Sequence, residues 1–320
     1  MTVFALLGTT ALASGPVRAA DIAAEVTALL QQVQALQAQV ATLQTQLSTV
    51  QANPALKLGA YVAVNPFSQN GLKGPNIIFQ GANIHIESGS GSMVDSTGLG
   101  NLVVGYNEDT LDPGDLDANR GGSHNLVVGP QHAYIGSGGI VGGYANVVGA
   151  NYSSVTGGEC NQAGVLSSAL AIGCLTNTNG NGTGGTDASS VSGGFFNVAG
   201  IDKQSGTSGF ATSVSGGSSN RASGTYASVS GGFSNTAIDI ASSVSGGESN
   251  EASGVTASVS GGNSNTAQGP LASISGGANN SASADHASVA GGDFNSAQGV
   301  GSSIGGGSGQ TTTGTDQNLN

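Results

Sequence analysis

Apolar residues recur at alternating steps of four and three between positions 22 and 50, with polar or small residues between them. This spacing matches the a and d positions of four heptads and predicts a parallel coiled coil over residues 21–53. Asn53 and Pro54 follow the last heptad and predict the end of the helix. The positions expected to pack between chains are Ile22, Val26, Leu29, Val33, Leu36, Val40, Leu43, Leu47 and Val50. An amphipathic helix on a globular core is the alternative, which the strict period of 3.5 disfavours.

The segment before the heptads, residues 1–20, contains an apolar run and ends in small residues at Ala19 and Ala20. It resembles an export signal with a small-residue cleavage site. No run of 18 uncharged apolar residues follows, so the sequence predicts no membrane-spanning helix. We therefore expect an extracellular or cell-surface location.

The pattern changes again in the predicted neck, residues 54–100. The short Ile-containing segments 76–80 and 83–87 flank Gly81 and Ala82, which predicts a β-hairpin. His85 falls on the polar face of the second predicted strand, where a lone histidine is usually solvated. Residues 88–100 are rich in Gly and Ser and are expected to form a connector.

A repeat of 15 residues dominates the rest of the chain. Its predicted core positions, each followed closely by a glycine pair, are Val214, Val229, Val244, Val259, Ile274, Val289 and Ile304. Asn recurs six residues after most of these positions and Ala eight residues after, as at Asn235 and Ala237. This period is too short for a helical hairpin and matches one coil of a β-solenoid with two short strands. We expect Val and Ala to point inward, Ser228 and Ser230 outward, and stacked Asn side chains to form a hydrogen-bonded ladder.

Degenerate copies extend the repeat towards the amino terminus. Their core positions are Val191, Leu170, Val155, Ile140, Leu126 and Leu102. Seven regular and six degenerate copies make thirteen predicted coils, with insertions such as residues 177–186 placed in surface loops. The predicted repeat domain spans 101–308 and is followed by a polar tail, 309–320.

The thin core of each coil bears on assembly. Burying one Val stabilises a fold by roughly 1.5–3 kcal/mol, whereas ordering each residue costs about 1.5 kcal/mol. One Val and two Ala per coil do not offset that cost, which favours copies that share their apolar strip. Heptads alone do not fix the number of strands, but three chains close a central core better than two, so we expect a parallel homotrimer.

Two segments, Leu126 to Gly129 and Leu170 to Gly173, resemble the Ser-Val-Ala-Ile-Gly motif in the YadA-like heads of trimeric autotransporter adhesins. The Ala-Ser-Val-Ser-Gly-Gly copies resemble a variant of that repeat, and the resemblance covers residues 101–307. It implies a left-handed parallel β-roll, assembled as a trimer and displayed outside the cell for adhesion to matrix proteins, surfaces or other cells. In the family a stalk and a membrane barrel follow the head. Here the coiled coil comes first and the end is polar, so we expect no self-formed membrane anchor.

Charge and composition exclude several classes of function. The chain has 18 acidic and six basic residues, a net charge of −12, and no cationic cluster that nucleic acid or an anionic membrane surface would need. His124, His132 and His286 lie in separate sequence contexts, and no glycine-rich segment ends in the Lys-Ser or Lys-Thr of a nucleotide loop. We expect no enzyme and no cofactor.

Two smaller features carry candidate chemistry. Asp115, Asp117 and Asn119 alternate like calcium ligands, but Arg120 stands where such a loop needs Gly, so a solvated acidic insertion is preferred over a calcium site. Cys160 and Cys174 lie five and four residues into consecutive predicted coils, which makes them a candidate disulfide in an oxidising compartment.

These features together predict a non-enzymatic extracellular fibre that attaches to host matrix, cells or abiotic surfaces, or assembles into fibres, through many weak contacts. A self-assembling filament subunit without a receptor and a phage-type trimeric fibre remain alternatives. An ice-binding solenoid is a weaker one, because the outward Ser residues lack the methyl group of Thr-x-Thr ladders.

Overall fold

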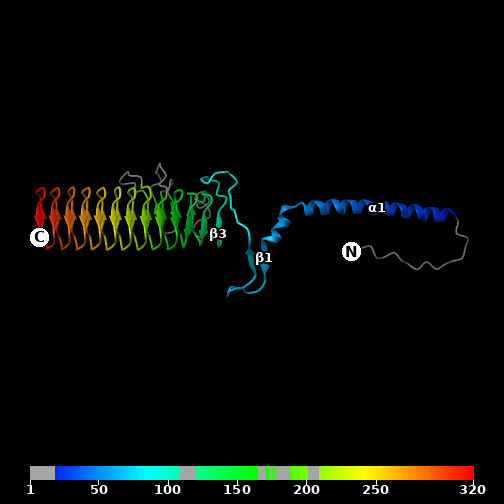
Figure 1. The fold of residues 1–320 in the computed structure, drawn as a ribbon, viewed down its shortest axis with the longest axis horizontal. Coiled ribbons are helices and arrows are strands. Elements are labelled where there is room, and N and C mark those ends of the chain that lie inside the picture. The colour runs from blue at the N-terminus through cyan, green and yellow to red at the C-terminus, as the bar shows by residue number, and fades with distance from the viewer. Residues whose placement is uncertain (1–18, 109–119, 165–169, 173–174, 178–187, 201–208) are drawn as a thin grey trace. The chain divides into compact units, whose positions relative to one another are not determined.

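The computed structural model describes residues 19–108, 120–164, 170–172, 175–177, 188–200 and 209–320 (Figure 1). The chain divides into two compact units, Met1–Ile84 and His85–Asn320. The described part of the first unit holds a long helix and a small hairpin, and the second unit holds the repeat.

Helix α1 (Ala19–Gln51) runs without interruption through the predicted heptads (Figure 1). The helix ends before Pro54, as predicted, and the Asn53 side chain accepts a hydrogen bond from the Ala55 N–H (2.9 Å) at the start of the 3-10 helix η1 (Pro54–Ala60). The a and d side chains of the heptads are 47–62% exposed. The apolar line of α1 is therefore not covered by the described part of its own chain.

The hairpin of the first unit joins β1 (Val62–Asn65) to β2 (Asn76–Phe79) in an antiparallel pair. The predicted hairpin between 76–80 and 83–87 is therefore wrong, because residues 83–87 form no strand. A side-chain hydrogen bond holds the loop between β1 and β2 to the start of β2: the Asn76 amide donates to the Phe67 carbonyl at 2.9 Å. The partner of β2 is therefore β1, which precedes it, and not the segment after Gly81 and Ala82.

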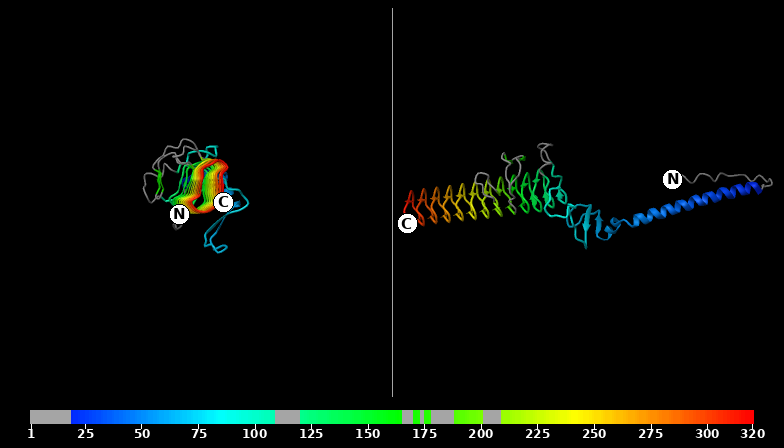
Figure 2. Two further views of the ribbon diagram at one scale, coloured as in Figure 1. Left: turned by 90° about the vertical axis from the view of Figure 1, so that its left-hand side faces the viewer. Right: turned by 90° about the horizontal axis from the view of Figure 1, so that it is seen from above.

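The second unit is an all-β parallel β-solenoid of about eleven turns with roughly 15 residues per turn (Figures 1 and 2). The valine sheet consists of β3 (Leu102–Val104), β4 (Leu126–Val128), β6 (Ile140–Gly142), β8 (Ser154–Val155), β12 (Ser190–Val191), β14 (Ser213–Val214), β16 (Ser228–Val229), β18 (Ser243–Val244), β20 (Ser258–Val259), β22 (Ser273–Ile274), β24 (Ser288–Val289), β26 (Ser303–Ile304) and β28 (Asn318–Leu319). The alanine sheet consists of β5 (Ala133–Tyr134), β7 (Val147–Val148), β9 (Gln162–Ala163), β13 (Val198–Ala199), β15 (Arg221–Ala222), β17 (Thr236–Ala237), β19 (Glu251–Ala252), β21 (Thr266–Ala267), β23 (Ser281–Ala282), β25 (Ser296–Ala297) and β27 (Thr311–Thr312). Seen along the solenoid, successive turns overlie one another (Figure 2).

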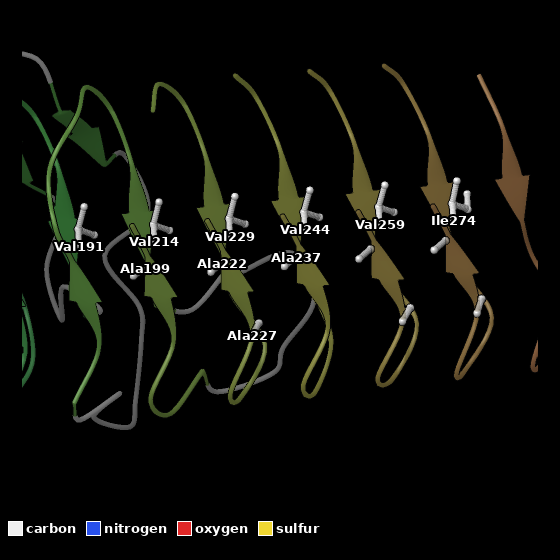
Figure 3. Packing of buried hydrophobic residues seen from close by; sticks show 14 of the residues in the cluster. Val191, Ala199, Val214, Ala222, Ala227, Val229, Ala237, Val244, Val259 and Ile274 are labelled. Atoms are coloured by element: carbon white, nitrogen blue, oxygen red, sulfur yellow. The ribbon is translucent and has the colours of Figure 1, made fainter. Parts of the chain in front are cut away.

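The core consists of stacked rows of small apolar side chains, mainly Val and Ala, between the two sheets (Figure 3). The seven predicted core positions, from Val214 to Ile304, are each about 1% exposed, and Ala237 and its counterparts are fully buried. The prediction of the repeat core is confirmed. The apolar strip that we expected copies to share is instead enclosed within each coil, because the Val of one sheet packs against the Ala of the other.

The register of the first coils differs from the prediction by one residue. Strand pairing aligns Val141 with Val155 and Ile140 with Ser154, and it aligns Val127 with Val141. Val127 and Val141 are fully buried, whereas Ile140 is 40% exposed. Consecutive apolar residues offer no polar alternation, so the sequence alone did not say which of them points inward.

The predicted coil at Leu170 is also wrong. Strand β10 (Leu170–Ile172) pairs antiparallel with β11 (Leu175–Asn177), and β12 stacks directly on β8. The predicted core position of this copy therefore lies in a hairpin inserted between two coils. Strands so close in sequence close a hairpin with little loss of chain entropy.

The predicted polar tail, 309–320, forms a further coil of the solenoid. Strand β28 pairs with β26 and β27 pairs with β25. Thr312 takes the place of Ala297 in the core and is fully buried, which its hydroxyl tolerates because it donates to Ser302 Oγ at 2.8 Å. A polar sequence thus continues the solenoid by satisfying its buried hydroxyl.

Candidate functional surface

The outer face of the valine sheet carries two columns of hydroxyl groups. The first column is formed by the half-buried Ser213, Ser228, Ser243, Ser258, Ser273, Ser288 and Ser303, which pair in register. The second column, two residues later in each coil, is formed by the exposed Ser215, Ser230, Ser245, Ser260 and Ser275. Neighbouring strands are about 4.8 Å apart, so these columns present a regular hydroxyl array, as predicted for the outward face.

A glycine pair turns the chain after each serine pair. Gly232 has φ +89°, and a Cβ at this position would overlap the carbonyl oxygen of Gly247 in the next coil. A Cβ on Gly231 would meet no heavy atom within 4 Å. The second glycine is therefore required by the stacking of coils, whereas the first is not.

Asparagine side chains form a continuous ladder inside the solenoid, as predicted, although its bonds run to the backbone. In one coil the Asn250 Oδ1 accepts from the Asn265 N–H at 3.0 Å, and its Nδ2 donates to the carbonyls of Gly246 and Gly262, both at 2.9 Å. The carboxamides of this asparagine ladder are Asn107, Asn146, Asn161, Asn197, Asn220, Asn235, Asn250, Asn265, Asn280 and Asn295. From Asn146 to Asn295, each amide thus ties a glycine corner to the next coil.

His132 occupies one step of this ladder, which the sequence analysis did not anticipate. Its backbone N–H donates to the Asn107 Oδ1 at 2.9 Å, and its Nδ1 accepts from the Asn146 N–H at 3.2 Å. Its Nε2 lies 3.0 Å from the Val128 carbonyl, so the proton sits on Nε2 in a neutral ring. Burial of the fully enclosed side chain lowers the pKa of His132, and the positive charge of Arg120 adds to this effect.

Asp95 organises the connector that precedes the first coils, although no sequence motif marks this residue. Its carboxylate accepts hydrogen bonds from the hydroxyls of Ser88, Ser90 and Thr97, each at 2.6 Å, and from Ser123. Ser123 belongs to the solenoid, so this carboxylate ties the connector to it. These bonds, of which that from Ser123 has the largest effect, hold the pKa of the Asp95 carboxyl far below its ordinary value.

The other histidines take structural or exposed positions. His124 Nε2 accepts from the Ser88 N–H, and its Nδ1 lies 3.0 Å from the Met93 carbonyl. His286 lies 2.8 Å from Asp285 and is exposed, while His85 is exposed beside Glu87. The side chains of His85, His124 and His286 contact different groups and do not form a common site.

Several predicted features lie outside the described residues. These are residues 1–18 of the export segment, the calcium candidate Asp115, Asp117 and Asn119, the loop residues 178–186, and Cys174. Cys160 is fully buried and is disulfide-bonded; its pairing with Cys174 stays a prediction, because Cys174 is not among the described residues. Among the described residues, no group of three or more His, Cys, Asp or Glu side chains could hold a metal ion. No helix within the described ranges is long and apolar enough to cross a membrane.

The fold and its outer face define a parallel β-solenoid with a regular polar surface, preceded in sequence by a helix. No family model and no curated protein matches this chain.

Proposed function

We propose that the protein is an exported, non-enzymatic extracellular fibre protein that attaches to surfaces, or assembles into fibres, through many weak contacts. The observation that carries this proposal is the register of the outer hydroxyl array, in which Ser213 to Ser303 repeat coil after coil. A weak contact that is copied at fixed spacing on a rigid scaffold becomes strong, since the entropy of immobilising the scaffold is lost only once. The resemblance to YadA-like heads supports the same function.

The exposed heptads of α1 support a parallel homotrimer. Apolar a and d side chains such as Leu29 and Leu43, about 60% exposed in the single chain, gain most from burial against other copies. The solenoid core adds nothing to this argument, because it is closed within each chain. The choice of a trimer over a dimer rests on the resemblance to YadA-like heads. The left-handed sense of the coils rests on the same resemblance.

The acidic charge and the absence of a basic patch in the sequence favour neutral or polar surfaces over nucleic acid or anionic membranes. Matrix proteins, other cells and mineral surfaces are the targets that fit. A filament subunit without a receptor is the alternative, and it uses the same repeated surface on a second fibre.

The test shortens the array by four coils while keeping the register of the remaining coils. Deleting residues 230–289 joins Val229 to Ala290, which follows Val289 in the native chain, so four whole coils are lost without a change of register. Adsorption to immobilised collagen and to a neutral hydroxyl-terminated monolayer is measured with a quartz crystal microbalance, and filament formation by electron microscopy. We expect the adsorbed amount of the shortened protein to fall by a larger factor than the length of its solenoid. Unchanged attachment and unchanged filaments would show that the repeat is only a spacer.

A second variant set identifies the face. Replacing the second serine column with Ala (S230A, S245A, S260A, S275A) removes exposed hydroxyls, and Ala290 already occupies this position in a native coil. The matched control replaces hydroxyls on the alanine sheet (T236A, T266A, S281A, S296A). We expect only the first set to weaken attachment.

A further inference from the structure

The outer face of the valine sheet changes from apolar to polar along the solenoid. In the first column, Leu102 pairs with Leu126 and Leu126 with Ile140, after which the same column continues as Ser154 and Ser190. In the second column, Val104 pairs with Val128. The five apolar residues Leu102, Val104, Leu126, Val128 and Ile140 are called the apolar patch.

The apolar patch is exposed in the single chain. Leu102 and Val104 are 48% and 53% exposed, Val128 and Ile140 are each 40% exposed, and Leu126 is half-buried. Their neighbours Val127 and Val141 on the same strands are fully buried, so β4 and β6 keep a closed core beneath the patch.

A hollow of about 610 Å³ adjoins the patch. It is lined by Leu102 and Leu126, by the apolar connector residues Ile86 and Met93, and by polar residues that include Glu87 and His124. The fold does not require this apolar surface, because later coils place Ser at the same positions with the same strand pairing.

The occupant is indicated by charge and by position in the chain. Each copy carries a net charge of −12, so contact between two copies costs least where the touching surface carries no charged side chain. The patch contains no charged residue, and its coils are the first to follow α1, whose heptads are exposed. Parallel chains held by such a helix place the same coils at the same height, so that patch meets patch.

We propose that the apolar patch packs against the apolar patch of a second copy of this chain, so that the apolar contact between copies lies at the first three coils. The inference rests on the proposed parallel assembly through α1. It places the apolar contact between copies on the outer face of the valine sheet, at its first three strands.

Photo-crosslinking in the full chain tests which surface covers the patch. Position 128 receives p-benzoylphenylalanine in place of Val, and the matched control places it at Ser230, in the same column of a later coil. We expect irradiation to give crosslinked chains from position 128, with peptide mapping to residues 102–140 of another copy, and much less product from position 230. Crosslinks to the β1–β2 hairpin, or equal yields from both positions, would overturn the inference.

A second experiment measures the strength of the contact. The double variant L126S/I140S introduces the Ser that later coils carry, and S213A/S228A is the control in the same column. By sedimentation equilibrium we expect the concentration of half-assembly to rise at least about tenfold for the first variant and to stay near the wild-type value for the control. Equal effects of the two variants, with circular dichroism showing both folded, would contradict the inference.

Failure of this inference is distinguishable from failure of the proposed assembly. If α1 does not associate, the wild-type chain sediments as a monomer at every concentration. If α1 associates but the patch does not pack, the wild-type chain is an oligomer and position 128 gives no crosslink to another copy.

Discussion

The Nδ1 atom of His132 accepts a hydrogen bond from the Asn146 N–H at 3.2 Å, where the other steps described for the asparagine ladder use a carboxamide oxygen. A protonated imidazole carries hydrogen on both nitrogens and offers no lone pair to that N–H. At this step of the ladder, His132 Nδ1 accepts the hydrogen bond from the Asn146 N–H only when the imidazole ring is neutral. The positive charge of Arg120, whose Nε donates to the His132 carbonyl at 3.2 Å, further disfavours the charged ring.

Replacing His132 with Asn should make the solenoid less sensitive to acid. The folded state lowers the pKa of His132, so below the unfolded value of about 6.5 the unfolded chain binds more protons and stability falls. In wild-type protein this contribution is present above about pH 6.5 and is lost as pH falls towards the folded pKa. Urea unfolding at pH 7.5 and pH 5.0 measures the difference, which H132N should reduce.

The control for this prediction is H286N, which removes an exposed imidazole beside Asp285. It should keep the wild-type loss of stability between the two pH values. An H132N chain that loses as much stability as the wild type would contradict the role of His132 in the ladder.

Replacing Gly232 with Ala should destabilise the solenoid far more than replacing Gly231. The Gly232 Cβ would overlap the Gly247 carbonyl, and φ +89° is unfavourable for Ala, so we expect a loss of about 3 kcal/mol or more. G231A meets open space and should change the free energy of unfolding by less than about 1 kcal/mol. Urea unfolding monitored by circular dichroism compares the two; equal losses would contradict the close approach of coils at Gly232.

Replacing Asn250 with Ala should be costly because this buried side chain makes three hydrogen bonds. The Asn265 N–H and the Gly246 and Gly262 carbonyls would lose bonds of 2.9–3.0 Å, for which we expect a loss of about 2–4 kcal/mol. The matched control is N263A, an exposed Asn in the same region, which should cost less than about 0.5 kcal/mol. Similar unfolding midpoints for the two variants would show that the ladder contributes little.

Replacing Asp95 with Asn should loosen the connector. An amide cannot accept the four hydroxyl bonds as a carboxylate does, so amide hydrogens of residues 88–97 should exchange faster while the distant coils keep their protection. The lowered pKa of Asp95 means that its contribution is present above the unfolded value of about 3.9 and is lost as pH falls below it. Hydrogen exchange measured by mass spectrometry checks this, with D293N as the control that should leave the connector unchanged.

The sequence by itself determined the regular coils. A strict 15-residue period, one inward apolar residue, one Asn and a glycine pair leave a single arrangement in which like residues stack, so the core from Val214 to Ile304 followed directly. The end of α1 before Pro54 followed from local chemistry in the same way. These features depend on neighbours in sequence or on exact repetition.

Only the tertiary structure decided the features that depend on pairing between distant segments. The apolar runs around Val127 and Val141 fit two registers, and pairing with β8 selected the one that buries both valines. His132 became a ladder step because Asn107 and Asn146 stack on either side of it. Asp95 joins the connector to the solenoid because Ser123, 28 residues away, donates a hydrogen bond to its carboxylate. A hydrogen bond depends on the position of both partners, and for residues so far apart that position exists only once the coils have stacked.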